Sequence, residues 1–153
     1  MLIKRIILLF WALFFSLVFV TDVADGLTAM GALSPDFIFA SANYGFMLEV
    51  TGIYGTPAWV VTLLFTGVVV WAGAAAFMFW RAFAGFAAWD GPSGRLVETA
   101  FALGIGLWAA FLVADEFFLA YLTTDVSSVH LRLFIAQIAS LLVVALVPDR
   151  DAG

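Results

Sequence analysis

Residues 58–80 read AWVVTLLFTGVVVWAGAAAFMFW and contain no charged side chain. A helix of about 20 apolar residues, rising about 1.5 Å per residue, is long enough to cross the hydrocarbon core of a bilayer. Pro57 comes directly before the run and suits a first helical turn, and Arg81 follows the run. This stretch therefore predicts a membrane-spanning helix.

Three further apolar runs lie on either side of this one, at residues 6–21, 96–122 and 131–147. The first is uncharged, the second holds acids at Glu98, Asp115 and Glu116, and the third holds only Arg132. Together the four runs predict an all-α polytopic membrane protein. We expect one domain over residues 1–153, with spans at about 6–21, 58–80, 96–122 and 131–147.

The composition agrees with lipid as the main solvent. The chain has 153 residues, of which 65% are hydrophobic and 11% charged, whereas soluble domains are about 45–50% apolar and about 25% charged. This excludes a soluble enzyme, and the lack of cysteine excludes disulfide, thiolate and iron–sulfur chemistry. The net charge of −5 argues against nucleic acid. We predict no cofactor, and the lipid bilayer as the main partner.

Basic residues predict the orientation in the membrane. With the N-terminus inside, the cytoplasmic side holds Lys4, Arg5, Arg81, Arg95 and Arg150. The outer side then holds only Arg132. Because Lys and Arg concentrate on the cytoplasmic side, we expect a multi-pass protein of the inner or plasma membrane with both termini in the cytoplasm.

The outer segment between the first two spans is unusually apolar for a loop. Ser34-Pro35-Asp36 combines a capping hydroxyl, a proline for the first turn and an acid that suits the helix dipole. We therefore expect a short helix over about residues 35–50 at the outer membrane interface.

Small side chains predict where helices meet, because helices in lipid associate by close packing. The third span carries them at consecutive i+4 positions, namely Ala102, Gly106, Ala110 and Ala114. We expect this stripe to pack within the chain, with an oligomer interface as the alternative. Gln137 is expected to form a hydrogen bond across helices. The central tryptophans Trp11, Trp71 and Trp108 are expected to pack.

Polar residues gather near the outer ends of the spans, and they form the candidate polar or ion cluster. Its members are Asp22, Asp25, Asp115, Glu116, His130 and Arg132. Carboxylates with an imidazole could bind a divalent cation or pass protons, so whether a metal binds stays open. Arg132 and His130 lie about 200° apart on a helix and cannot both face the same acids. We expect Arg132 to pair with an acid, which makes the cluster structural.

These features leave three functional hypotheses. The first is a small membrane protein without an evident catalytic site, serving as an accessory or structural subunit beside other subunits or further copies of itself. The second is an oligomeric ion or proton pathway that uses the outer carboxylates. The third is a membrane enzyme acting on a lipid or quinone, with Asp115, Glu116 and His130 as acid–base groups.

Several short motifs resemble those of a protein family. They are Thr21-Asp22 after the first span, Asp115-Glu116-Phe117-Phe118 late in the third, Arg132-Leu133-Phe134 opening the fourth, and Val147-Pro148-Asp149-Arg150 closing it. The chain resembles the small four-helix integral membrane proteins grouped as a bacterial domain of unknown function. It departs from them at Trp71-Ala72, where an acid would be expected. The resemblance implies the four-span architecture and no particular activity.

The predicted topology is testable with reporter fusions. Fusions at Gly153 and near Ser93 should report the cytoplasm, because the positive-inside rule places both points there. A fusion near residue 40 should report the outer side. A periplasmic signal from either of the first two fusions would overturn this orientation.

Overall fold

The computed structural model describes residues 1–87, 89, 92–122 and 125–148. Among these residues all regular secondary structure is helical, and no strand is present. The long helices are α1 (Leu2–Ala29), α3 (Ala58–Gly85), α4 (Pro92–Phe117) and α5 (Val126–Leu146), and α2 (Asn43–Thr51) is short. Each long helix is long and apolar enough to cross a membrane. The predicted all-α, four-span membrane architecture with a short helix after the first span is confirmed.

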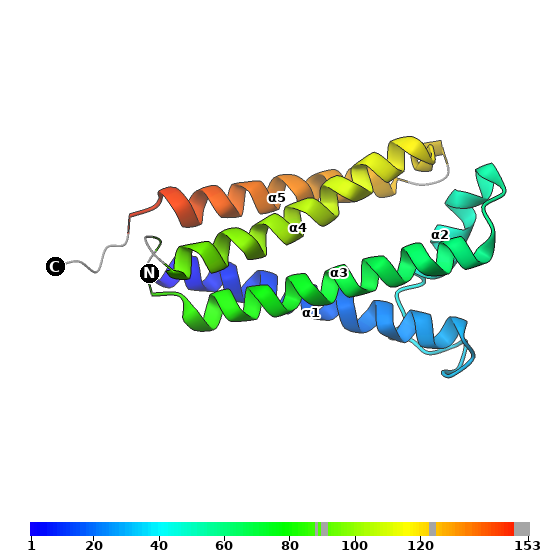
Figure 1. Ribbon diagram of the computed structural model, residues 1–153, viewed down its shortest axis with the longest axis horizontal. Coiled ribbons are helices and arrows are strands. Elements are labelled where there is room, and N and C mark those ends of the chain that lie inside the picture. The colour runs from blue at the N-terminus through cyan, green and yellow to red at the C-terminus, as the bar shows by residue number, and fades with distance from the viewer. Residues whose placement is uncertain (88, 90–91, 123–124, 149–153) are drawn as a thin grey trace.

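The four long helices run side by side along the long axis of the molecule (Figure 1). The start of α1, the end of α3, the start of α4 and the end of α5 meet at one end, which we call the termini end. The opposite end carries α2, and we call it the α2 end. Single-turn 3-10 helices follow α2 and α4, at Gly52–Tyr54 and Ala120–Leu122.

The helix bounds differ from the predicted spans. Helix α1 continues beyond the predicted end to Ala29, and it therefore includes Asp22 and Asp25. Helix α4 begins at Pro92, before the predicted start of the span at about residue 96. It ends at Phe117 rather than residue 122, because Leu119 adopts a left-handed φ of 52°.

The short helix begins later than predicted, so the expected start at Ser34-Pro35-Asp36 is wrong. Ser34 instead opens a turn in which its carbonyl accepts from the Phe37 N–H, and Phe37 opens another that ends at Ala40. Helix α2 begins only at Asn43, after Ala42 has turned the chain with a φ of 63°. Side-chain contacts from α1 hold this turn in place, as described below.

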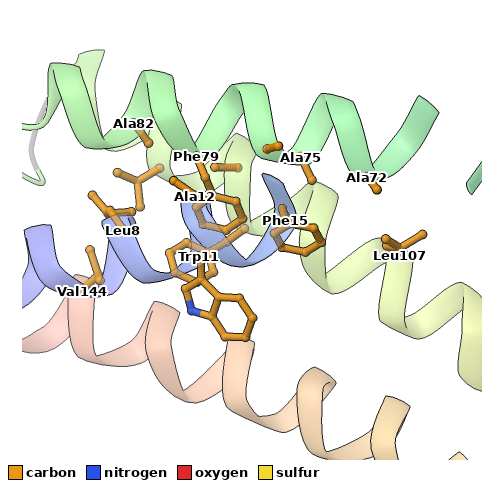
Figure 2. Close-up of a cluster of buried hydrophobic side chains, with 14 of the residues drawn as sticks. Leu8, Trp11, Ala12, Phe15, Ala72, Ala75, Phe79, Ala82, Leu107 and Val144 are labelled. Atoms are coloured by element: carbon orange, nitrogen blue, oxygen red, sulfur yellow. The ribbon is translucent and has the colours of Figure 1, made fainter. Parts of the chain in front are cut away.

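Aromatic rings between α1 and α3 form the centre of the core (Figure 2). Phe15 and Phe79 stack almost in parallel, with centroids 5.5 Å apart and planes 9° apart. Helix α3 faces α1 with small residues, including Ala72 and Ala75, which are fully buried. Small side chains let the two backbones approach closely, which is the main source of helix association in lipid.

The remaining helices are added in sequence order. Helix α1 packs chiefly on α3, α3 on α4 and α4 on α5, whereas α5 meets α1 over a smaller area. Phe101 of α4 meets Phe79 edge to face at 5.1 Å, and Trp108 stacks on Phe15 at 6.0 Å. In α5 the described buried residues are Gln137 and Val144. Helix α5 is therefore the least enclosed of the four.

Truncation of the central ring tests this core. Phe79→Ala should lower the free energy of unfolding by about 3–5 kcal/mol, because it removes ring contacts to Phe15 and Phe101 and leaves a cavity. Phe77→Ala is the matched control on the same helix, since Phe77 is 58% exposed. Reversible unfolding in lipid–detergent mixtures measures both. Equal losses for the two variants would contradict the proposed core.

Candidate functional site

Two buried carboxylates at the α2 end of α1 organise the chain that follows it. Asp22 and Asp25 are 1% and 7% exposed. Asp22 Oδ1 accepts from Asn43 Nδ2 at 2.8 Å, and Asp25 Oδ2 accepts from the Tyr44 backbone N–H at 2.7 Å and the Ser41 hydroxyl at 3.2 Å. Asp25 thus gives the Tyr44 N–H, in the first turn of α2, an acceptor that the helix itself cannot provide, and the two side-chain bonds hold Ser41 and Asn43 to α1.

A groove of about 240 Å³ lies beside Asp22, between α1, α2 and α3. Its polar lining comes from the Asp22 carboxylate and the hydroxyls of Tyr44, Thr62 and Thr66. The Tyr44 and Thr62 oxygens lie 3.0 Å apart, and Thr66 donates to the Thr62 carbonyl. The polar groups of the groove are thus already paired with protein, which favours a structural role for it.

A third buried acid lies on the other helix pair, α4 and α5. Asp115 of α4 meets His130 of α5, with 2.7 Å between Oδ2 and Nδ1. Such a short separation requires a proton between the two atoms. The imidazole stacks on Phe111, with centroids 4.7 Å apart, and also on Trp108 at 6.1 Å. The His130 side chain is 14% exposed, so the pair lies just beneath the surface.

The predicted cluster is therefore divided. The hydrogen bonds of Asp22 and Asp25 join α1 to Ser41–Tyr44, whereas Asp115 bonds to His130. Glu116 and Arg132 are exposed. Across the described residues, no group of three or more His, Asp or Glu side chains could hold a metal ion. Among the described residues, the hydrogen bonds therefore do not join these six side chains into one cluster.

The predicted pairing of Arg132 with an acid is also wrong for the part of the chain that the structure describes. Helix α5 begins at Val126, so His130 already lies on regular helix and faces α4. Arg132 is two positions further along and points to the opposite side. His130, rather than Arg132, therefore contacts an acid of α4.

Only part of the small-residue stripe of α4 faces outward, because Gly106 packs against Trp71 of α3. Ala102 and Ala110 are exposed, and Gly106 and Ala114 are half-buried. The buried face of α4 is instead formed by other residues, namely Gly94, Val97, Ala100, Phe101, Gly104, Leu107, Trp108 and Asp115. The prediction of packing within the chain is wrong at Ala102 and Ala110, because the aromatic rings of α4 turn toward α1 and α3.

Gln137 lies where predicted but is not bonded as predicted. It is fully buried in the middle of α5, against Gly104 of α4, where an added Cβ would overlap its amide. Neither Nε2 nor Oε1 has a hydrogen-bond partner among the described residues, and the same holds for the indole nitrogens of Trp11 and Trp108. We expected both tryptophans only to pack; their buried N–H groups are the signal that this expectation missed.

Comparison with family models, with curated proteins and with solved structures finds no match to this chain. The resemblance to small bacterial membrane proteins therefore stays a prediction.

The role of Asp25 is testable by exchange of backbone hydrogens. Asp25→Ala should speed exchange at Tyr44 and loosen the start of α2, because loss of the acceptor costs about 1–3 kcal/mol. Asp25→Asn is the matched control, since its amide oxygen can still accept. Mass spectrometry of residues 41–51 in nanodiscs measures both. Wild-type exchange rates in Asp25→Ala would contradict this role.

Proposed function

We propose that this membrane protein is an accessory or structural subunit of a larger membrane assembly and that α4 contacts the partner. The observation that carries the proposal is the outward direction of Ala102 and Ala110. They lie two turns apart on one side of α4, while Phe101 and Leu107 fill the core. We call the exposed surface at Ala102 and Ala110 the small-residue face.

A surface of small side chains is suited to contact with another helix in the membrane. Small side chains let a second helix approach closely, and this close packing drives association in lipid, where burial of apolar surface supplies little. Trp71 of α3 borders the face: its ring contacts the Gly106 position, and its indole donates to the Leu103 carbonyl at 3.0 Å. This hydrogen bond holds the Trp71 indole against α4, so the indole forms a fixed boundary of the small-residue face.

The large share of the described chain that lies in the four long helices also supports a subunit role. Most described residues belong to the four long helices, and the connection that holds α2 is the largest segment between them. Little chain is left to form a separate catalytic unit. The proposal places the protein in the inner or plasma membrane with cytoplasmic termini, and its partner is another membrane subunit or a further copy.

Site-specific crosslinking tests the proposal. The chain has no cysteine, so a single introduced thiol is unique. A thiol-directed photocrosslinker attached at Ala102→Cys or Ala110→Cys should convert a large share of the protein into a crosslinked protein product in native membranes. Ala136→Cys is the matched control, because Ala136 is also exposed and lies as far from the termini end of α5 as Ala102 does in α4.

The products discriminate between the alternatives. A product of twice the monomer mass indicates a second copy, and another discrete mass indicates a different subunit. Crosslinking only to lipid at both α4 positions, or equal protein crosslinking at Ala136→Cys, would contradict the proposed contact.

A further inference from the structure

The described buried side-chain atoms that lack a protein hydrogen-bond partner belong to α1, α4 and α5. They are Trp11 Nε1, Trp108 Nε1, Ser127 Oγ, and Nε2 and Oε1 of Gln137. Ser127 and Gln137 belong to α5, and Trp108 stacks on His130 of that helix. Figure 2 shows Trp11 projecting from α1 toward the ribbon of α5. Four of these five atoms therefore belong to α4 and α5.

The positions of these groups along α4 and α5 follow from the helix geometry. Gln137 lies against Gly104, and Trp108 is one turn further along the same face of α4. His130 is two turns from Gln137 on the same side of α5 and stacks on Trp108. Trp108 thus lies between the His130–Asp115 pair and the Gln137 amide.

Trp11 reaches the same depth as Gln137 from the other side. Trp11 and Trp108 both contact the rings of Phe14 and Phe15, at centroid distances between 5.5 and 6.2 Å. Trp11 is one turn nearer the termini end than Phe15, just as Gly104 is one turn nearer that end than Trp108. The Trp11 indole and the Gln137 amide therefore lie at a similar level in the middle of the bundle.

The chemistry of these groups selects their ligand. Two indole N–H groups donate only, and the Gln137 amide both donates and accepts. A carbonyl compound could accept from the donors but would leave Gln137 Oε1 without a donor. Water both donates and accepts, is the smallest such molecule, and typically makes about three bonds to otherwise unpaired buried groups. Lipid around the bundle offers no such partners.

We propose that the α4–α5 seam is an internal water-binding site that extends from the His130–Asp115 pair to Gln137. Water enters from the α2 end, where the His130 side chain is partly exposed. Toward the termini end the seam is closed by fully buried Leu8 and Val144. The site is therefore open to one side of the membrane, which goes beyond a role in assembly.

Nuclear magnetic resonance of the ¹⁵N-labelled protein in lipid nanodiscs tests the site directly. Rotating-frame cross-peaks to water should appear for the Trp108 and Trp11 indole N–H groups and for the Gln137 amide, with the sign of direct contact rather than exchange. Trp71 is the negative control, because its indole donates to a backbone carbonyl. Trp59, which is 70% exposed, is the positive control. Tryptophan-to-phenylalanine variants assign the signals.

The water cross-peaks at Trp108 and Gln137 decide for or against the site. Water cross-peaks at Trp108 and Gln137 but not at Trp71 support the site, and Gln137→Leu should then weaken the Trp108 cross-peak at least twofold. Ile138→Leu, next to Gln137 in α5, should leave it unchanged. Absence of cross-peaks at Trp108 and Gln137 in the wild-type protein, with Trp59 giving its signal, would overturn the proposal even if Gln137→Leu does not fold.

Discussion

The stacked contact of Phe15 with Phe79 is the interaction on which the rest of the bundle depends. In lipid the helices gain little by hiding apolar surface from one another, so their association relies on close van der Waals packing. Alanines on α3 allow the rings to meet, and Phe101 and Trp108 then pack α4 onto the same rings. The order in which the helices pack on one another therefore follows from these central aromatic rings.

The same arrangement determines where buried polar groups raise the free energy of the folded state. Because α1, α3 and α4 share the aromatic centre, α5 is left with α4 as its main neighbour. The seam between these two helices holds the Asp115–His130 pair and the Gln137 amide. An unpaired buried polar group costs about 1–3 kcal/mol, so a chain that keeps several of them in one seam must offset that cost. Bound water would do so there, while the exposed small-residue face leaves α4 available to a partner.

The sequence predicted the fold well because the spans depend on length and on the absence of charge, which are properties of one helix at a time. It predicted the site poorly because a site depends on how helices rotate against each other. The i+4 spacing of Ala102 and Ala110 indicates a contact face but not its direction, which Phe101 and Trp108 decide by turning inward. Helix geometry likewise showed that only one of His130 and Arg132 could face the acids of α4. Which of them does so depends on the start of α5 at Val126.

Accessibility of spin labels along α1 is the most direct test of the central claim that these helices cross a bilayer around a packed aromatic core. Labels at buried Leu8, Ala12 and Phe15 should resist collision with oxygen, whereas labels at exposed Phe10, Leu13 and Leu17 should collide readily. A water-soluble nickel complex should reach none of them. Nickel access to the exposed positions would contradict the membrane span, and uniform oxygen access at all six positions would contradict the packed core.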